Sequence, residues 1–178
     1  MATPKLATTF VVLLLTGVLS GPRGVDAACP SSWRRNGNFC YRLFNEQRTW
    51  GAAENRCKTF RPLNRAICQG ATAHLVSIHS QSEQNFVYNY FRSKCGVQSD
   101  SRMWIGLNDI QREGTMVWSD GTQYNFRAWL SGEPNNAGPT DNEDCVHIGL
   151  RLNPDKWNDI ACSYPKSNVR HFMCKMRA

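Results

Sequence analysis

Two stretches of the chain carry apolar residues at helical spacing, and several shorter stretches read as strands. In the first helical stretch, Trp50, Ala53 and Cys57 fall on one face. Thr49 is a suitable N-cap for this helix, and Pro62 prevents its continuation. The pattern therefore predicts an amphipathic helix that starts near residue 50.

The second helical stretch covers residues 81–94. Its apolar face is formed by Phe86, Val87, Tyr90 and Phe91. With Ser80 as the N-cap, Glu83 completes a capping box, and Cys95-Gly96 marks the end of the helix. We expect a helix over the whole of this stretch.

Short apolar runs predict the strands. They cover residues 41–44, 74–78, 103–107, 116–118, 145–148, 160–162 and 170–174. Asn36-Gly37 predicts a hairpin turn before the first of them, and Trp157-Asn158-Asp159 is expected to lie between two of them. Trp104, Trp118 and Trp157 are expected in the core. These elements predict one α+β domain over residues 29–178.

Residues 1–27 have the features of a cleaved signal peptide. Lys5 precedes an apolar run that ends near Leu19, and Val25-Asp26-Ala27 provides a small-residue cleavage site. The run is shorter than the ~20 residues that a membrane span requires, which argues against an uncleaved anchor. We therefore expect a secreted, extracellular protein that does not associate with a membrane.

The eight cysteines are expected to form disulfides, because an even number after a signal peptide is typical of exported proteins. Cys29 and Cys40 would close a hairpin-sized loop, and Cys145 and Cys162 would close an acidic loop. Cys68–Cys95 is then the surplus pair. No CxxC or HExxH spacing occurs, so zinc is not expected, and His147 is interpreted as structural.

The chain is basic, with 21 Lys and Arg against 14 Asp and Glu and a formal net charge of +7. The basic residues are dispersed and do not alternate with aromatic residues in a nucleic-acid-binding pattern. A solvated basic surface is the favoured interpretation, and incidental attraction to acidic polymers is the alternative.

Oxygen-bearing side chains concentrate in the stretch from Glu133 to Asp159. They are Glu133, Asn135, Asn136, Asp141, Asn142, Glu143, Asp144, Asp155, Asn158 and Asp159. Few basic neighbours offset their charge, so they repel one another unless water or a hard cation separates them. Calcium takes six to eight oxygen ligands from such mixed sets. The stretch therefore predicts a Ca²⁺ site, and a merely solvated loop is the alternative.

Several motifs, in this order and at this spacing, resemble the C-type lectin-like domain. They are Cys40-Tyr41, Trp50…Ala53…Cys57, Trp104-Ile105-Gly106-Leu107, Glu133-Pro134-Asn135, Glu143-Asp144-Cys145, Trp157-Asn158-Asp159 and Cys174. The resemblance covers residues 29–178 and implies the C-type lectin-like fold. It also implies the disulfides Cys29–Cys40, Cys57–Cys174 and Cys145–Cys162.

In sugar-binding members of that family, five residues hold one calcium ion. The matching residues here are Glu133, Asn135, Glu143, Asn158 and Asp159. The resemblance implies that two sugar hydroxyls complete the calcium shell and that Glu133, Asn135, Glu143 and Asn158 also bind the carbohydrate. The order Glu-Pro-Asn implies mannose-type sugars (mannose, N-acetylglucosamine, glucose and fucose), whereas Gln-Pro-Asp would imply galactose. A cis peptide bond is expected before Pro134.

The resemblance also suggests an auxiliary calcium site. Its residues would be Asp109, Glu113, Asn136 and Asp144, with Glu143 completing the set. Asn136 stands where mannose-binding members often have Asp, and the loop that follows is slightly longer than theirs. The sequence leaves both an occupied and an empty auxiliary site open.

The expected function is therefore secreted, calcium-dependent binding of mannose-type glycans, including microbial surface glycans in innate immunity. Useful avidity would require a homo-oligomer, because single sugar sites are usually weak. An enzyme is not expected, since no nucleophile accompanies Glu143 and Asp144. The alternative is an extracellular structural, mineral-matrix or protein-interaction module on the same scaffold.

Overall fold

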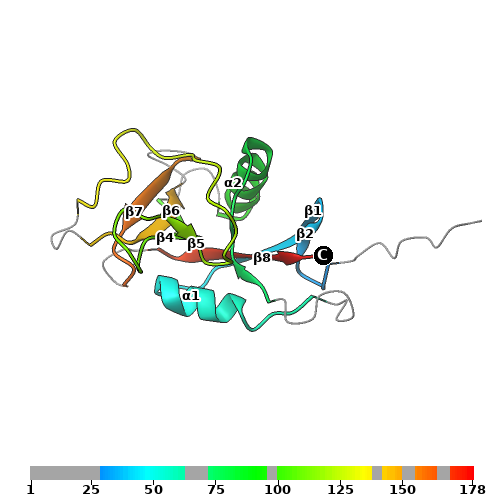
Figure 1. Cartoon of the computed structure of the whole chain (residues 1–178). Coiled ribbons are helices and arrows are strands. Elements are labelled where there is room, and N and C mark those ends of the chain that lie inside the picture. Colours follow the sequence, from blue (N-terminus) through cyan, green and yellow to red (C-terminus); the bar gives the residue numbers. More distant parts are fainter. Residues whose placement is uncertain (1–28, 63–71, 96–99, 138–141, 150–154, 164–168) are drawn as a thin grey trace, which may run out of the picture.

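The computed structural model describes residues 29–62, 72–95, 100–137, 142–149, 155–163 and 169–178 (Figure 1). Its elements are β1 (Arg34–Asn36), β2 (Phe39–Phe44), α1 (Trp50–Cys57), β3 (His74–Leu75), α2 (Gln81–Cys95), β4 (Arg102–Asn108), β5 (Val117–Trp118), β6 (Cys145–Gly149), β7 (Trp157–Ile160) and β8 (His171–Arg177). The expected signal peptide lies outside the described residues. Within them, no helix combines the length and the apolar character needed to cross a membrane.

The strands form one sheet in the order β1-β2-β8-β4-β6-β7, with β3 also paired to β8 and β5 to β4. All pairings are antiparallel except β4–β8, in which Met103 lies opposite His171. The last strand therefore lies inside the sheet, between β2 and β4. This arrangement joins the two ends of the described chain and confirms the α+β prediction.

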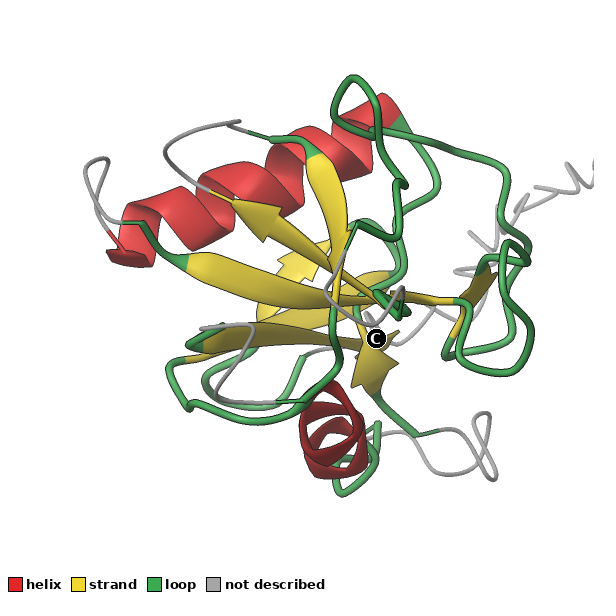
Figure 2. Cartoon of the chain, turned by 90° about the vertical axis from the view of Figure 1, so that its left-hand side faces the viewer, coloured by secondary structure: helices red, strands yellow, loops and turns green. Residues whose placement is uncertain are grey.

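The two helices cover opposite faces of the sheet, as Figures 1 and 2 show. Side chains alternate along each strand because successive Cβ atoms point to opposite faces. Met103 and Ile105 accordingly pack in the core beneath α2, while Trp104 packs in the core beneath α1. Trp118 and Trp157 are also buried, which confirms the prediction that these three tryptophans are core residues.

Local signals place α1. The Thr49 hydroxyl accepts a hydrogen bond from the Ala52 N–H at 3.2 Å, so Thr49 is the N-cap as predicted. Trp50 donates its indole N–H to the Ile105 carbonyl at 2.8 Å and fixes the helix to β4. Ala53 and Cys57 are fully buried on the same face.

The capping prediction for α2 is confirmed in part. The Ser80 hydroxyl accepts from the Glu83 N–H at 3.2 Å. The Glu83 carboxylate, however, accepts from the N–H of His79 at 2.9 Å, one residue before the expected position. Glu83 also contacts Lys175 at 2.6 Å and so ties the start of α2 to β8.

Gly106 allows β3 to approach β4. A Cβ atom at this position would lie 2.7 Å from the Leu75 carbonyl oxygen and 2.8 Å from the Ser119 hydroxyl. Both are closer than a carbon atom tolerates, and the first is backbone. The glycine in the Trp104–Leu107 motif is therefore required by this contact.

Glu54 is a buried carboxylate at the centre of the α1 interface, with only 4% of its surface exposed. It accepts from the Leu75 N–H at 2.8 Å and the Ser119 hydroxyl at 3.0 Å, and it contacts His74 at 2.7 Å and Lys58 at 3.2 Å. Burial alone would raise the pKa of Glu54, but the bonds with His74 and the Leu75 N–H outweigh burial and lower it. Glu54 is thus a satisfied structural anion.

Three of the four expected disulfides are present: Cys29–Cys40, Cys57–Cys174 and Cys145–Cys162. Cys57–Cys174 joins α1 to β8 across 117 residues. A loop of that length corresponds to about 4–5 kcal/mol in the chain-entropy account of disulfide stabilisation. The expected Cys68–Cys95 bond involves Cys68, which lies outside the described residues.

Two strand predictions are wrong. Residues 160–162 were expected to form a strand after Trp157-Asn158-Asp159, but these three residues themselves lie in β7, which ends at Ile160. The chain leaves the sheet there because Cys162 is bonded to Cys145 and its carbonyl accepts from the Trp50 N–H at 3.1 Å. β3 is also shorter than the expected 74–78, since only His74 and Leu75 pair with β8.

Candidate functional site

The acidic side chains singled out by the sequence meet where β7 lies beside the loop that contains Glu133. β7 pairs with β6, with Asp159 opposite Val146 and Asn158 opposite His147. The loop is anchored on its other side by a bridge between Trp129 and Trp157. In Figure 1 this loop and β7 lie on the left, at the far end of the molecule from the β1–β2 hairpin.

Asp159 organises the loop. Its carboxylate accepts from the backbone N–H of Asn135 at 3.3 Å and from that of Asn136 at 3.0 Å. The side chain is almost fully buried, with 1% exposed. Asp159 therefore fixes the backbone that carries Glu133 and Asn135, and those two flank a cis peptide bond before Pro134, as expected.

Hydrogen bonds connect the other members. Asn135 donates from Nδ2 to Glu133 Oε1 at 3.0 Å. The Ala137 N–H donates to Asn135 Oδ1 at 2.9 Å and to Glu143 Oε2 at 3.1 Å, so one amide joins these two side chains. The structure thus brings Glu133, Asn135, Glu143 and Asp159 into one cluster.

Asn158 is the fifth expected ligand. It lies next to Asp159 on β7, and its Nδ2 donates to the Asp159 carbonyl at 2.6 Å. Holding a cation beside that carbonyl would require the amide to turn so that Oδ1 replaces Nδ2. The rotation exchanges two groups of nearly equal size and needs no backbone movement.

The cluster carries more negative charge than its surroundings offset. Burial, then the hydrogen bond and charge of Asp159, then the charge of Glu143, raise the pKa of Glu133 to about 7. Burial and the Asp159 charge also raise the pKa of Glu143. Within the described residues, neither of these glutamates nor Asp159 forms an ion pair with a basic side chain.

One atom in the cluster has an unmet bonding capacity. Glu133 Oε2 is buried and has no hydrogen-bond partner in the described part of the chain. A buried carboxylate oxygen without a donor is costly unless a cation or water contacts it. Carboxylate and amide oxygens are the donors that calcium prefers, so the residues fit a calcium ion.

Calcium binding would require the hydrogen bonds within the cluster to rearrange, and it would use the two asparagine side chains. Among the described residues, no three His, Cys, Asp or Glu side chains already surround a common point as metal ligands do. Two members of the expected set, Asn135 and Asn158, are asparagines and would ligate through their amide oxygens. Of the other three, Glu143 and Asp159 accept from backbone N–H groups and Glu133 accepts from the Asn135 amide, bonds that a cation would replace.

The expected auxiliary residues come together only in part. Asp109 accepts from the Gly114 N–H through Oδ2 at 2.9 Å, and its Oδ1 is buried without a partner among the described residues. Burial, and then the charge of Asp109, raise the pKa of Asp144. Glu113 is exposed, and Asn136 accepts from the Glu143 N–H at 2.6 Å. The structure therefore brings Asp109 and Asp144 close together, and the exposed Glu113 forms no hydrogen bond or ion pair with either of them among the described residues.

The sequence interpretation missed Gln84. This buried residue on α2 accepts from the Trp157 indole N–H at 3.0 Å and donates to the Asp155 carbonyl. It therefore positions the start of β7, next to Asn158. The available signal was a polar residue on the apolar face of α2, three positions before Val87 and seven before Phe91.

His147 is structural, as expected. It is buried on β6, and burial together with the nearby Arg102 charge lowers its pKa to about 3. The imidazole is therefore neutral at physiological pH. It adds no positive charge to the carboxylate cluster beside it.

Comparison with known proteins identifies the relatives of this chain. Residues 64–176 match the family described as Lectin C-type domain. Echinoidin from Heliocidaris crassispina is 39% identical over 151 residues, covering 83% of this chain and 96% of echinoidin. A C-type lectin mannose-binding isoform from Oxyuranus scutellatus is 36% identical over 164 residues, 92% of this chain and 93% of that protein. The crystal structure of the C-type lectin CEL-I from Cucumaria echinata has a TM-score of 0.70 and 31% identity, covering 83% of this chain and 96% of CEL-I.

Proposed function

Because the chain belongs to the C-type lectin family of non-enzymatic carbohydrate-binding proteins, we propose that it binds mannose-type glycans in a calcium-dependent manner. The observation that carries this proposal is Glu133. Its pKa is raised to about 7 by burial, Asp159 and Glu143, and its Oε2 lacks a partner within the described residues. A calcium ion would offset the repulsion between the carboxylates and would contact the unpartnered Oε2 atom of Glu133.

The residues that would hold the ion are Glu133, Asn135, Glu143, Asn158 and Asp159. Bound there, calcium would offer coordination positions to two neighbouring hydroxyl groups of a sugar. Glu133 and Glu143 would each accept a hydroxyl proton, and the Asn135 and Asn158 amides would donate to hydroxyl lone pairs. Hydrogen bonds to ionised carboxylates are stronger than neutral ones, so the two glutamates would fix the sugar most firmly.

The sugar class follows from the order of acceptor and donor along the loop. Glu133 precedes Pro134 and Asn135, and the Asn135 amide already donates to Glu133, so the two functional groups lie side by side. By resemblance to sugar-binding members of the family, this order would favour the equatorial hydroxyl pair of mannose-type sugars. The relative from Oxyuranus scutellatus, named a mannose-binding isoform, supports the same choice.

The auxiliary pair Asp109 and Asp144 would hold a second calcium ion only with further ligands, because two carboxylates supply fewer than the six to eight oxygens that calcium takes. We further propose that the chain is secreted after removal of residues 1–27. It would act on multivalent surface glycans as a homo-oligomer, since several weak sites together bind more tightly than one. Recognition of microbial glycans in innate immunity is the role that this combination fits.

A mannose-agarose column tests the proposal. The protein should be retained in millimolar calcium and released by EDTA, with galactose-agarose as the matched control resin. Passage through mannose-agarose in calcium would reject calcium-dependent mannose binding. It would favour the second candidate, a structural, mineral-matrix or protein-interaction role on the same scaffold.

A further inference from the structure

Two arginines on neighbouring elements lie over the same two aromatic rings. Arg42 on β2 has its guanidinium carbon 4.7 Å from the centroid of Phe44 and 5.5 Å from that of Phe60. Arg56 on α1 has its guanidinium carbon 5.6 Å and 4.9 Å from the same centroids. Phe44 stacks in turn on Phe172 of β8, 4.8 Å away. The two guanidinium groups are therefore held near each other on a rigid aromatic base.

These charges have no counter-ion within the described residues. Neither Arg42 nor Arg56 forms an ion pair there. The carboxylate on α1 is Glu54, which is buried and occupied by His74 and Lys58. The positive charge on this face is therefore available to a ligand.

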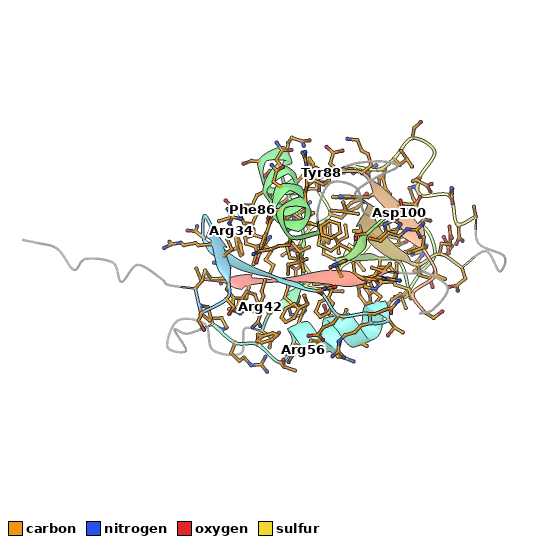
Figure 3. The ribbon with its side chains drawn as sticks, turned by 180° about the vertical axis from the view of Figure 1, so that it is seen from behind. Arg34, Arg42, Arg56, Phe86, Tyr88 and Asp100 are labelled. Atoms are coloured by element: carbon orange, nitrogen blue, oxygen red, sulfur yellow. A yellow bond between two sulfur atoms is a disulfide. The ribbon has the colours of Figure 1, made fainter. Side chains whose placement is uncertain are left out.

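More positive charge follows α1. Arg61 is exposed and donates from one guanidinium nitrogen to the Lys58 carbonyl at 2.6 Å, so it is held close to the end of the helix. Lys58 is exposed as well but is paired with Glu54 at 3.2 Å, and the sequence contains no further Asp or Glu before Glu83. We call the surface formed by Arg42, Arg56 and Arg61 the basic face. Figure 3 shows Arg42 and Arg56 on the part of the molecule that contains β2 and α1.

We propose that the basic face binds a sulfated polysaccharide. A guanidinium group matches a sulfate with two parallel N–H donors. A guanidinium that lies over a ring can still donate from its edge; Arg56 uses one nitrogen on the Thr59 hydroxyl at 3.4 Å and keeps its other N–H groups for a ligand. Confinement of the side chain reduces the entropy lost on binding. A polyanion with repeated sulfates can contact several of these cations at once and gains further from the release of its counter-ions.

Other polyanions fit the basic face less well. Nucleic-acid bases require exposed aromatic rings for stacking, but the guanidinium groups already cover Phe44 and Phe60. An anionic membrane favours apolar side chains that insert between lipids. Within the described residues, the large apolar side chains classed as exposed are Ile110 and Val117, which lie around β5 and not on the basic face.

The test is binding to heparin, a sulfated polysaccharide, in EDTA over a series of salt concentrations. The variant Arg42→Gln/Arg56→Gln should bind about tenfold more weakly, and its slope of log affinity against log salt should fall by about two. The matched control is Arg92→Gln/Arg127→Gln, which removes the same charge from exposed positions on α2 and in the loop after β5. The control should change heparin affinity less than about twofold.

Three results would overturn the proposal: equal weakening in both double variants, unchanged binding in the first, or equally tight binding of single-stranded DNA or phosphatidylserine vesicles. If Arg42→Gln/Arg56→Gln does not fold, Arg42→Lys/Arg56→Lys keeps the charge but loses the paired donors, and it should still bind heparin about threefold more weakly. Wild-type affinity of that variant would equally refute the proposal. Each variant is also tested for retention on mannose-agarose in calcium. Because heparin binding is measured in EDTA, this second measurement shows separately whether the proposed lectin activity is present.

Discussion

Glu54 is a buried glutamate and Glu133 a half-buried one, and the fold treats their carboxylates in opposite ways. Glu54 is surrounded by donors, namely the Leu75 N–H, the Ser119 hydroxyl, His74 and Lys58, and its pKa is lowered despite burial. Glu133 accepts from the Asn135 amide but faces the carboxylates of Asp159 and Glu143, and burial together with these charges raises its pKa to about 7. A buried anion that the fold satisfies holds the structure together. One that the fold leaves unsatisfied marks a place where a ligand supplies the missing charge.

The largest effect should come from removing Glu54. Glu54→Ala leaves the Leu75 N–H without an acceptor and His74 without its partner, so we expect a loss of about 3–4 kcal/mol in the free energy of unfolding. Urea denaturation measures this loss. Glu46→Ala, which removes a partly exposed partner of Arg48, is the control and should cost under about 1 kcal/mol. Similar losses in both variants would show that Glu54 is not a structural anion.

Glu133→Gln should behave in the opposite way. In EDTA at pH 8 the variant should be as stable as the wild type or about 1 kcal/mol more stable, because it removes repulsion from Asp159 and Glu143. Its calcium affinity, measured by titration calorimetry, should fall about 10- to 100-fold, since a charged ligand is lost. A clear loss of stability in EDTA would place Glu133 in the same class as Glu54.

A smaller effect is expected from exchanging acceptor and donor in the loop. Glu133→Gln/Asn135→Asp keeps one carboxylate and one amide, so calcium binding should persist while the preferred hydroxyl geometry changes. Inhibition by free monosaccharides should shift about tenfold from mannose toward galactose. An unchanged preference for mannose would contradict the roles given to these two side chains.

The smallest expected effect is on the dependence of the free energy of unfolding on acidic pH. The pKa of Glu54 lies below its ordinary value of 4.5 in the folded protein, so the unfolded chain takes up the proton first as pH falls. The stabilisation is therefore complete above pH 4.5 and is lost as pH falls through the folded-state pKa. Urea denaturation between pH 6 and pH 3 should show a flatter pH dependence for Glu54→Gln than for the wild type. Glu46→Gln should keep the wild-type dependence, and a Glu54→Gln curve that keeps it too would refute the assignment.

Much of this structure could be predicted because its signals are local. The helices α1 and α2 are specified by nearby caps at Thr49 and Ser80 and by apolar residues at helical spacing. The Glu133-Pro134-Asn135 motif and the residues near β7 could likewise be found as a set. These residues could be found because some of them are neighbours in the sequence and the others follow the order of motifs in a known family.

The features that could not be predicted depend on contacts between residues that are far apart in the sequence. Trp157-Asn158-Asp159 was expected to lie between two strands, and the motif itself was not predicted as a strand. Pairing with β6, which brings Asp159 opposite Val146, decides otherwise. The role of Gln84 depends on Trp157, 73 positions later, and the two arginines of the basic face meet only because Phe44 and Phe60 come together. No short window of sequence contains these relations.

The Cys57–Cys174 bond has a consequence for proteolysis. It joins two residues 117 positions apart, so a single protease cut anywhere between them leaves both fragments covalently attached. A nicked molecule would therefore migrate as one band on a gel without reductant and separate into two bands only when reductant is added. In an extracellular setting rich in proteases, such a molecule could lose a peptide bond in a surface loop and still keep α1 fastened to β8.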